Sequence, residues 1–591
     1  MLPFLLTLFG IGLVLFVHEA GHFLAARAAG VRVEVFSLGF GPRLFGWRRG
    51  DTDYRISLLP LGGYVRMAGE DQTRPPLPEE LGAQSPGWRL LIFSGGILMN
   101  FLFALVLIPI LFAVGVPFEA PVAGQVEPGG PAWRAGVREG ERILAVNGEP
   151  IHAFRSFAAA VALGEAEEVV VDLAEPDGGR RQVRLRPAYD EEAGVRRVGL
   201  APSLWSPSLT LRIRPGSVAE EAGLRDGDRL IGVDGVPVRD RQAARLLLEH
   251  ALLASGPLVL AVEREGERIE ARLERTAPTA EDPPQIGVLH LLNEVQEVRD
   301  PRLAAVLRPG DRILRAAGRP VRAMAELAIE ALRHPEGLDL EIEREGRHER
   351  LSLPPIDAAD LVAGLWLDGG EEVRVGVRPG GPADGSGLAD GDRILRAAGR
   401  EIPDMATLGR IVRTAEGPLR LLVSRPGRPD PFPVVIEPRP LPRPDFGFQL
   451  EADREVVRTD GPVEAIATGL AEARRMILEI GDTIRGMLSG SVDSRNLGGI
   501  ITIGTLTHSF ASEGLIPLLF FLAMISIHLA VLNLLPVPAL DGGHMLFVLI
   551  EMVRGRPLSP STQGWLNLAG LVAVFSLILF VTMNDLDRLF G

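Results

Sequence analysis

The sequence of 591 residues contains no cysteine and no lysine. Without cysteine the chain forms no disulfide and offers no thiolate ligand, so any zinc site must use nitrogen and oxygen donors. Without lysine, all 62 basic residues are arginines, a bias that we attribute to the base composition of the genome rather than to a binding role. The net charge of −14 argues against nucleic acid as a partner.

The apolar residues gather near the two ends of the sequence. Four apolar stretches there have close to the number of residues that a helix needs to cross a bilayer: 2–29, 90–116, 515–535 and 565–583. The long middle, 117–456, is rich in charged residues, glycine and proline and cannot span a membrane. The pattern predicts a multi-domain polytopic membrane protein, with an α-helical core of four transmembrane spans and one large soluble insert.

Arginines close to the spans predict the orientation of the chain. They crowd the loop between the first two spans, and two more follow the third span at Arg554 and Arg556. By the positive-inside rule both segments face the cytoplasm, which places the insert and both termini outside. The arginines of the first loop are Arg32, Arg43, Arg48, Arg49, Arg55, Arg66 and Arg89.

The motif His18-Glu19-Ala20-Gly21-His22 lies inside the first apolar stretch. Histidines four residues apart share one face of a helix, and with the adjacent carboxylate they can supply two zinc ligands and a general base. An ionisable side chain at this depth costs about 2.5–3.5 kcal/mol, so a bound cation is the expected compensator. Two other interpretations are weaker. One is a buried helix with hydrogen-bonded histidines; the other is a cleaved signal peptide, which would need a basic start.

A catalytic zinc usually has three protein ligands and one water, so a third ligand is expected from a distant segment. The best candidate is Asp541, in the stretch 533–544 (NLLPVPALDGGH), where two prolines interrupt the third span. A broken helix at membrane depth is tolerated where it lines a polar cavity. His544 competes for the same role, and we favour Asp541. His528 could contact substrate or be a packed histidine, and we favour the packed histidine.

Four segments of the insert share the phrase small-Gly-apolar-x-x-Gly-Asp-x-Ile-Leu, with its second glycine at 140, 227, 310 and 391. A period of 80 to 90 residues is typical of a small domain rather than of a solenoid repeat. Each segment continues with a turn, a helical stretch and an alternating hairpin. The phrase resembles α+β PDZ domains of the bacterial type, which bind peptides by adding a strand to a sheet edge. The alternative is a stack of folded spacers, and the divergent third copy fits that role best.

The expected organisation follows from these features. A first transmembrane helix with the HExxH motif (1–30) precedes a cytoplasmic loop with a membrane-associated β-hairpin (31–89) and a second helix (90–116). Four PDZ-like units (117–202, 203–285, 286–356 and 357–442) lead to an amphipathic region (443–514), in which 463–488 is a surface or linker helix. The third transmembrane helix (515–550) and the fourth with the C-terminus (551–591) complete the chain.

The two motifs together resemble the site-2 protease family of intramembrane zinc metalloproteases. Further matches are Phe36 to Pro42, Leu59 to Val65, Asn100-Phe101 and Gly461 to Ile466, so the resemblance covers nearly the whole chain apart from the additional PDZ-like copies. It implies that His18, His22 and Asp541 bind Zn²⁺ and that Glu19 is the catalytic base. It also implies that 54–67 forms a membrane-entering β-hairpin, with Gly62, Gly63 and Tyr64 beside the substrate strand, and that Asn533 holds the substrate backbone. An ordinary cytoplasmic hairpin is the alternative for 54–67.

The resemblance implies regulated intramembrane proteolysis in the bacterial inner membrane, with the PDZ-like units gating access from outside and the active site toward the cytoplasm. Its substrates would be single-span membrane proteins of the anti-sigma factor or signal-peptide remnant type. The chain departs from the family in having Ser94-Gly95-Gly96 where Gly-Pro is common, and in having four PDZ-like copies rather than two. Competing hypotheses are a non-catalytic scaffold that binds peptide termini, and a metal transporter.

Overall fold

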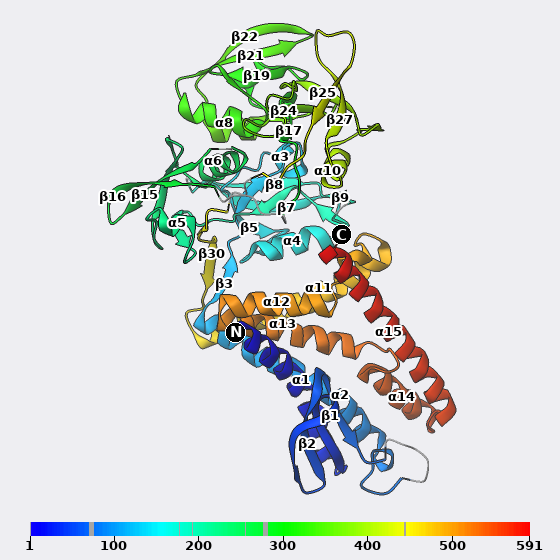
Figure 1. Cartoon of the computed structure of the whole chain (residues 1–591). Coiled ribbons are helices and arrows are strands. Elements are labelled where there is room, and N and C mark those ends of the chain that lie inside the picture. Colours follow the sequence, from blue (N-terminus) through cyan, green and yellow to red (C-terminus); the bar gives the residue numbers. More distant parts are fainter. Residues whose placement is uncertain are drawn as a thin grey trace.

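The computed structural model describes residues 2–590 except 70–75, 177, 192, 255, 276–281, 371 and 442–444. Within these residues, four helices are long and apolar enough to cross a membrane, which confirms the predicted number of spans. They are α1 (Leu2–Ala28), α2 (Pro86–Val114), α13 (Leu515–Leu534) and α15 (Pro560–Phe590). In Figure 1 both termini lie at the end of these helices nearest the insert, as four alternating spans require.

Helices α1 and α2 cross at paired glycines. A Cβ on Gly21 would lie 2.1 Å from the carbonyl oxygen of Gly95, and one on Gly95 would lie 2.6 Å from that of Gly21. Small residues allow such close backbone contact between helices in lipid, where dispersion contacts replace the hydrophobic effect. The crossing therefore fixes the face of α2 that lies over the histidines of α1.

The predicted third segment, 515–550, is two helices in the structure. Helix α13 ends at Leu534, and α14 (Asp541–Arg554) begins only after the connection through Pro536 and Pro538. Proline has no backbone N–H and clashes with the preceding turn, so a helix cannot continue through both residues. The break makes Asp541 the first residue of a helix that contacts α2.

Residues 31–89 contain two long bent strands, β1 (Val33–Arg49) and β2 (Thr52–Met67), followed by a short 3₁₀ turn, Leu81–Ala83. Residue Phe36 pairs with both Tyr54 and Val65, so the first half of β1 lies between the two halves of β2. The expected hairpin within 54–67 is therefore wrong, because its halves pair with 33–38 and not with each other. Alternation predicts which side chains share a face, but not which strand lies alongside. The half 62–67 is left at the edge of the sheet.

The insert contains four hydrophobic clusters, one for each copy of the repeated phrase. The first unit runs continuously from 123 to 202. Its elements are β4 (Ala123–Val126), α3 (Pro131–Arg134), β5 (Arg142–Val146), β6 (Glu149–Pro150), α4 (Phe154–Leu163), β7 (Val169–Ala174), β8 (Arg180–Leu185), β9 (Ala188–Asp190), β10 (Val195–Arg197) and β11 (Leu200–Pro202).

The other three units are nested rather than consecutive. The second comprises β12 (Leu211–Ile213), α5 (Val218–Glu221), β13 (Arg229–Val233), β14 (Val236–Pro237), α6 (Arg241–Leu253), β15 (Leu258–Arg264), β16 (Glu267–Leu273) and the distant β29 (Phe448–Leu450), which pairs with β12. The third comprises β18 (Glu294–Val298), α7 (Pro301–Ala304), β19 (Arg312–Ala316), β20 (Arg319–Pro320), α8 (Met324–Arg333), β21 (Leu338–Arg344), β22 (Arg347–Leu353), α9 (Ala358–Gly364) and β23 (Leu365–Asp368). The fourth comprises β17 (Val288–His290), β24 (Arg374–Val377), β25 (Asp392–Ala397), β26 (Arg400–Glu401), α10 (Met405–Arg413), β27 (Leu419–Ser424) and β28 (Phe432–Ile436).

The nesting shifts the expected boundaries of the last three units. Strand β17 lies before the third unit in the sequence but pairs with β24 of the fourth, and β23 lies beyond residue 356 but pairs with β18 of the third. Short closing strands of three or four residues carry too little pattern to show which sheet they join. The repeated phrase marks the middle of a unit and leaves its ends undefined.

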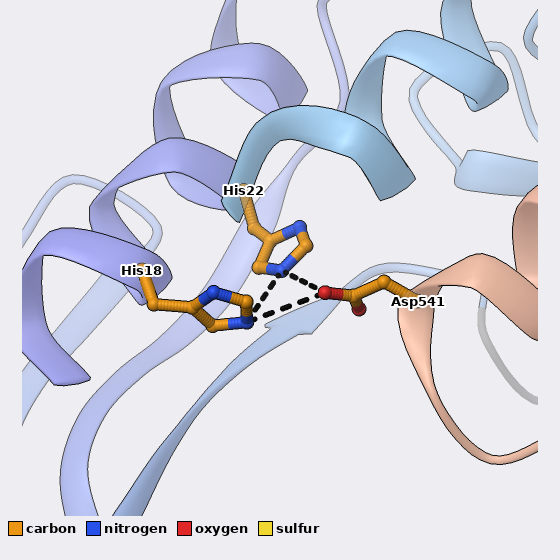
Figure 2. A group of neighbouring side chains, drawn as sticks. All are labelled: His18, His22 and Asp541. Carbon is orange, nitrogen blue, oxygen red and sulfur yellow. Dashed lines mark hydrogen bonds and ion pairs between the residues drawn. The ribbon is translucent and has the colours of Figure 1, made fainter. Parts of the chain in front are cut away.

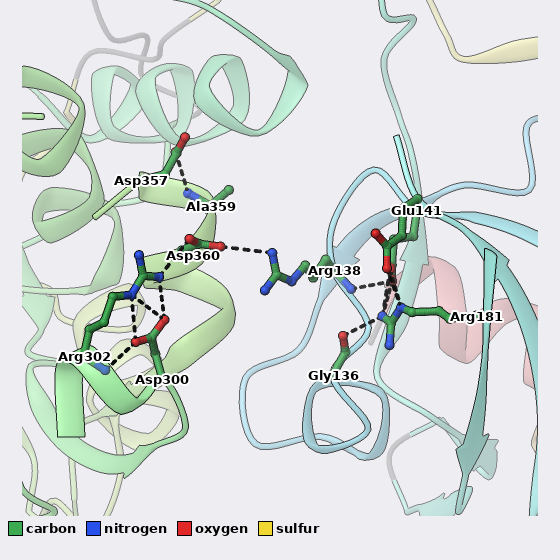
Figure 3. A network of polar contacts seen from close by, with 10 residues as sticks. Gly136, Arg138, Glu141, Arg181, Asp300, Arg302, Asp357, Ala359 and Asp360 are labelled. Atoms are coloured by element: carbon green, nitrogen blue, oxygen red, sulfur yellow. Dashed lines mark hydrogen bonds and ion pairs between the residues drawn. The ribbon is translucent and has the colours of Figure 1, made fainter. Parts of the chain in front are cut away.

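The structure explains the acidic residue of the repeated phrase, because this residue is buried and paired with an arginine in every unit. Glu141 accepts hydrogen bonds from Arg181 of the following hairpin and from the backbone of Arg138 (Figure 3), and Asp228 pairs in the same way with Arg264. Burial alone would raise the pKa of Asp228, but the hydrogen bonds from Arg264 and the backbone outweigh it and lower that pKa. The equivalent pairs are Asp311 with Arg344 and Asp392 with Arg425.

The insert is joined to the apolar helices by a short pair of strands and two further helices. Strand β3 (Val116–Glu119) follows α2 and pairs with β30 (Arg454–Val457), which leads into α11 (Pro462–Ser489) and α12 (Ile500–Glu513). Helix α11 matches the predicted amphipathic stretch and shares a hydrophobic core with α2 and α13. Oε1 of Glu472, also in α11, lies 3.7 Å from a guanidinium nitrogen of Arg155 in the first unit, so α11 links this unit to the spans.

Candidate metal centre and active site

Three predicted ligands from two distant helices meet at one point (Figure 2). The Nε2 atoms of His18 and His22 are 3.2 Å apart, and each lies 3.3 Å from Oδ2 of Asp541. Zinc bound tetrahedrally at about 2.0–2.1 Å places its donor atoms about 3.3 Å from one another. The spacing of the three donors therefore fits a zinc ion.

The protonation of the site also favours a cation. The Nδ1 atom of His22 donates to the carbonyl oxygen of Ile92 at 2.8 Å, so in the neutral ring Nε2 carries a lone pair and no proton. Oδ2 of Asp541 is buried, and no hydrogen bond from the described residues reaches it. The lone pairs of His22 Nε2 and Asp541 Oδ2, 3.3 Å apart, would repel each other, and a bound metal ion would replace this repulsion with coordination.

Helix α2 orients both imidazoles. The side-chain amide of Asn100, which is fully buried, lies 3.2 Å from Nδ1 of His18. The amide oxygen of Asn100 has no other partner among the described residues, and exchanging its oxygen and nitrogen lets His18 donate to it. Such outer contacts fix the ring orientation and the tautomer of a metal ligand. In the sequence Asn100 stands out only as a family match, because its contact with His18 depends on how α1 and α2 pack.

Two glycines make room for the site. A Cβ on Gly96 would lie 2.4 Å from Nε2 of His22 and 2.6 Å from Cε1 of His18, so α2 passes directly over both rings. A Cβ on Gly63 would lie 2.7 Å from Cγ of Glu19, so the edge of β2 approaches the predicted base equally closely. The sequence assigns Gly63 to substrate binding by resemblance, and it marks Gly96 only as a departure from the family pattern.

The three donors open into a cavity of about 490 Å³. Glu19, Gly63 and Tyr64 line it, together with residues of α14 and α15. Of the other predicted substrate contacts, the side-chain nitrogen of Asn533 lies 3.5 Å from Nε2 of His18. Gly62 is absent from the cavity wall and packs against Phe40, whose Cε2 would lie 2.3 Å from a Cβ at that position.

The two remaining histidines of the spans take other positions. His544 lines the cavity but stacks on the ring of Phe93, with centroids 5.1 Å apart, and does not join the three donors. His528 donates from Nδ1 to the carbonyl oxygen of Met524 at 2.8 Å. The geometry therefore brings Asp541, and not His544, to the paired histidines.

An ion pair that sequence reasoning missed lies in the wall of the same cavity. Arg89 of α2 contacts both carboxylate oxygens of Glu551 of α14, at 2.9 and 2.5 Å, and both side chains are largely buried. The pair fastens the far end of α14 to α2 and so helps to hold the helix that begins at Asp541. Because Arg89 and Glu551 are 462 residues apart, no local pattern indicates that they meet.

Comparison with known proteins identifies the family to which the chain belongs. A family model described as "Peptidase family M50" matches residues 6–577, so the chain belongs to this peptidase family and is a metalloprotease. The regulator of sigma-E protease RseP of Escherichia coli is 27% identical over 595 residues, covering 98% of this chain and 97% of that protein. A Ralstonia nicotianae protein named "Putative zinc metalloprotease RSc1411" is 27% identical over 624 residues, covering 100% and 99%.

Among solved structures, a PDZ domain protein from Parabacteroides distasonis aligns with 57% of this chain and 96% of its own. The TM-score is 0.13 at 10% identity, which is too low to assign the fold of the insert.

Proposed function

We propose that this metalloprotease is a zinc endopeptidase that cuts single-span membrane proteins within the bilayer. The observation that carries the proposal is the meeting of His18, His22 and Asp541, whose three candidate ligand atoms lie 3.2–3.3 Å apart and open to a cavity. The names of the relatives and the donor set both favour zinc as the metal. When bound, zinc would polarise the scissile carbonyl group and lower the pKa of the attacking water.

The residues of the chain then have separate tasks. Glu19 lies in the same cavity as the donors and would accept the proton of the water and later pass it to the leaving amine. Asn100 and the carbonyl of Ile92 would hold the two imidazoles in the tautomer that presents Nε2. Gly96 and Gly63 would keep the rings and the base within reach of the same peptide bond.

The substrate would bind as an extended strand. A helical segment shields its peptide bonds, so it has to unwind, and in lipid its freed N–H and C=O groups then need partners. The half-strand 62–67 of β2 lies at a sheet edge beside the donors and could pair with such a segment. Residues Gly63 and Tyr64 would lie next to the scissile bond, and Asn533 beside His18 would contact the backbone close to the metal.

The insert would decide which proteins reach the cavity. Arginines near the spans favour an extracytoplasmic insert in the bacterial inner membrane, with the active site toward the cytoplasm. Four units stacked above the helices (Figure 1) would exclude proteins with large outer domains. Substrates would then be remnants of an earlier cut, such as anti-sigma factors or signal peptides. Free peptide termini could bind at the PDZ-like units.

The test compares Glu19→Gln with the wild-type enzyme on a model single-span substrate in detergent micelles. We expect Glu19→Gln to lose cleavage while keeping its expression and zinc content, because Glu19 is not among the three donors. Cleavage by this variant at the wild-type rate would contradict the mechanism. A non-catalytic scaffold predicts instead that removal of His18, His22 or Asp541 leaves the cellular phenotype unchanged.

A further inference from the structure

The N-terminal part of α15 supplies part of the wall of the catalytic cavity. Gln563 and Asn567, one helical turn apart, both line the cavity that holds the three donors. Gln563 donates from its amide nitrogen to the carbonyl oxygen of Leu558 at 3.2 Å. Oδ1 of Asn567, in contrast, is buried, and no hydrogen bond from the described residues reaches it. Asn567 is therefore a cavity-lining residue whose buried amide oxygen has no hydrogen-bond partner among the described residues.

The position of Asn567 is fixed by a close contact three residues further along the helix. A Cβ on Gly570 would lie 1.8 Å from the carbonyl oxygen of Pro538, in the connection that leads to Asp541. Most of α15 is otherwise exposed, and only 6% of its most apolar stretch is buried. This close contact places the polar face of α15 against the segment that carries the third donor.

An unpaired amide at membrane depth is costly, because neither water nor lipid replaces its lost hydrogen bonds. Polar residues in transmembrane helices that face a cavity are therefore functional candidates. A substrate strand has two hydrogen-bonding edges, and pairing with residues 62–67 of β2 would satisfy one of them. The other edge still needs donors and acceptors in the cavity.

We propose that Asn567 is a substrate-positioning residue, which hydrogen-bonds the backbone of the unwound substrate on the edge that β2 leaves open. This inference rests on the proposed function and extends it by assigning the second edge of the substrate strand. An amide can both accept from an N–H and donate to a C=O, so it suits a backbone partner of any sequence. Asn567 would add affinity for extended segments without selecting particular side chains.

The experiment uses the full chain in detergent micelles and a synthetic single-span peptide. We expect Asn567→Leu, which has nearly the same shape, to raise KM about tenfold with little change in kcat, because the bond is made equally in the ground state and the transition state. Asn567→Gln, which keeps the amide, should recover part of the loss. Leu568→Ala, a change at an exposed neighbour, is the matched control and should behave as wild type. Zinc content should be the same in all variants.

Peptides with one backbone ester in place of an amide separate a direct contact from a structural effect. At one position the ester should lower kcat/KM of the wild-type enzyme about tenfold and have no further effect on Asn567→Leu, since the same bond is already lost. If the ester lowered kcat/KM equally in the wild-type enzyme and in Asn567→Leu, or if Asn567→Leu had the wild-type KM, this inference would be overturned. The proposed function would still stand. Absence of cleavage by the wild-type enzyme would overturn the proposed function, and this inference with it.

Discussion

Replacement of Gly96 by alanine tests how tightly α2 packs over the metal centre. The new Cβ would lie 2.4 Å from Nε2 of His22, which is 1.0 Å inside the 3.4 Å at which ordinary van der Waals contact begins. The backbone of α2 cannot retreat easily, because α11, α13 and α14 also pack against it. The imidazoles therefore have to move by about 1 Å, several times the tolerance of about 0.2 Å in a zinc–ligand distance.

We expect Gly96→Ala to weaken zinc binding at least about 100-fold, the upper range for disturbing the outer contacts of a zinc ligand. The assay is competition for zinc with a chelator of known affinity, followed by cleavage of the model substrate. Gly12→Ala, on α1 with nothing within 4 Å of its new Cβ, is the matched control and should bind zinc normally. Alanine favours a helix over glycine by about 1 kcal/mol, so lost helicity cannot explain a loss of zinc. Wild-type zinc affinity in Gly96→Ala would refute the packing argument.

Four further changes test other contacts. Gly63→Ala should displace Glu19 and lower kcat at least about tenfold while zinc content stays normal, whereas a loss of zinc would place the defect elsewhere. Asn100→Leu should lower zinc affinity about 10–100-fold in a chelator titration, and an unchanged affinity would exclude its role in orienting His18. Glu551→Gln should destabilise the protein by about 3 kcal/mol, because it leaves Arg89 without its partner, and exchanging the two charges should restore part of the loss in a thermal unfolding assay. Because the pKa of Asp228 is lowered in the folded state, its ionised form stabilises the protein above the unfolded pKa, and this stability is lost as the pH falls through the folded pKa. Asp228→Asn should therefore unfold more easily than wild type at pH 7, with a difference that shrinks in acid; a constant difference would contradict the ion-pair explanation.

The parts of the site that could be predicted depend on local geometry. The spacing of His18 and His22 places both rings on one face of any helix, so no knowledge of the fold is needed. The two prolines before Asp541 predict a helix break in the same local way, because each proline disrupts only the helical turn in which it lies. The length of the apolar stretches likewise predicts the four helices without any tertiary contact.

The parts that could not be predicted are contacts between segments far apart in the chain. The passage of Gly96 over the imidazoles and the pairing of Arg89 with Glu551 follow from how α2 crosses α1 and α14. The nesting of the last three units could not be predicted either, because it also depends on contacts between distant segments. Strand β29 has only three residues, and nothing in them indicates that they pair with β12 at the far end of the insert.

The order of the strand halves in the β1–β2 sheet could not be predicted either, although they lie close together in the sequence. Residues 54–67 do belong to one strand, β2, yet the strand that separates its two halves comes from 33–38. Which strand lies between them is decided by tertiary packing against α1 and α2, where Val33, Met67 and Ile92 share one hydrophobic cluster. Pattern alone carries no information on such neighbours.

The zinc content of the purified protein tests the central claim most directly, because the account requires one metal held jointly by His18, His22 and Asp541. Elemental analysis in detergent should give one zinc per chain for the wild-type protein and for His544→Ala, and almost none for Asp541→Ala. Full zinc occupancy in Asp541→Ala, with loss in His544→Ala, would contradict the assignment of the third ligand and the site built around it.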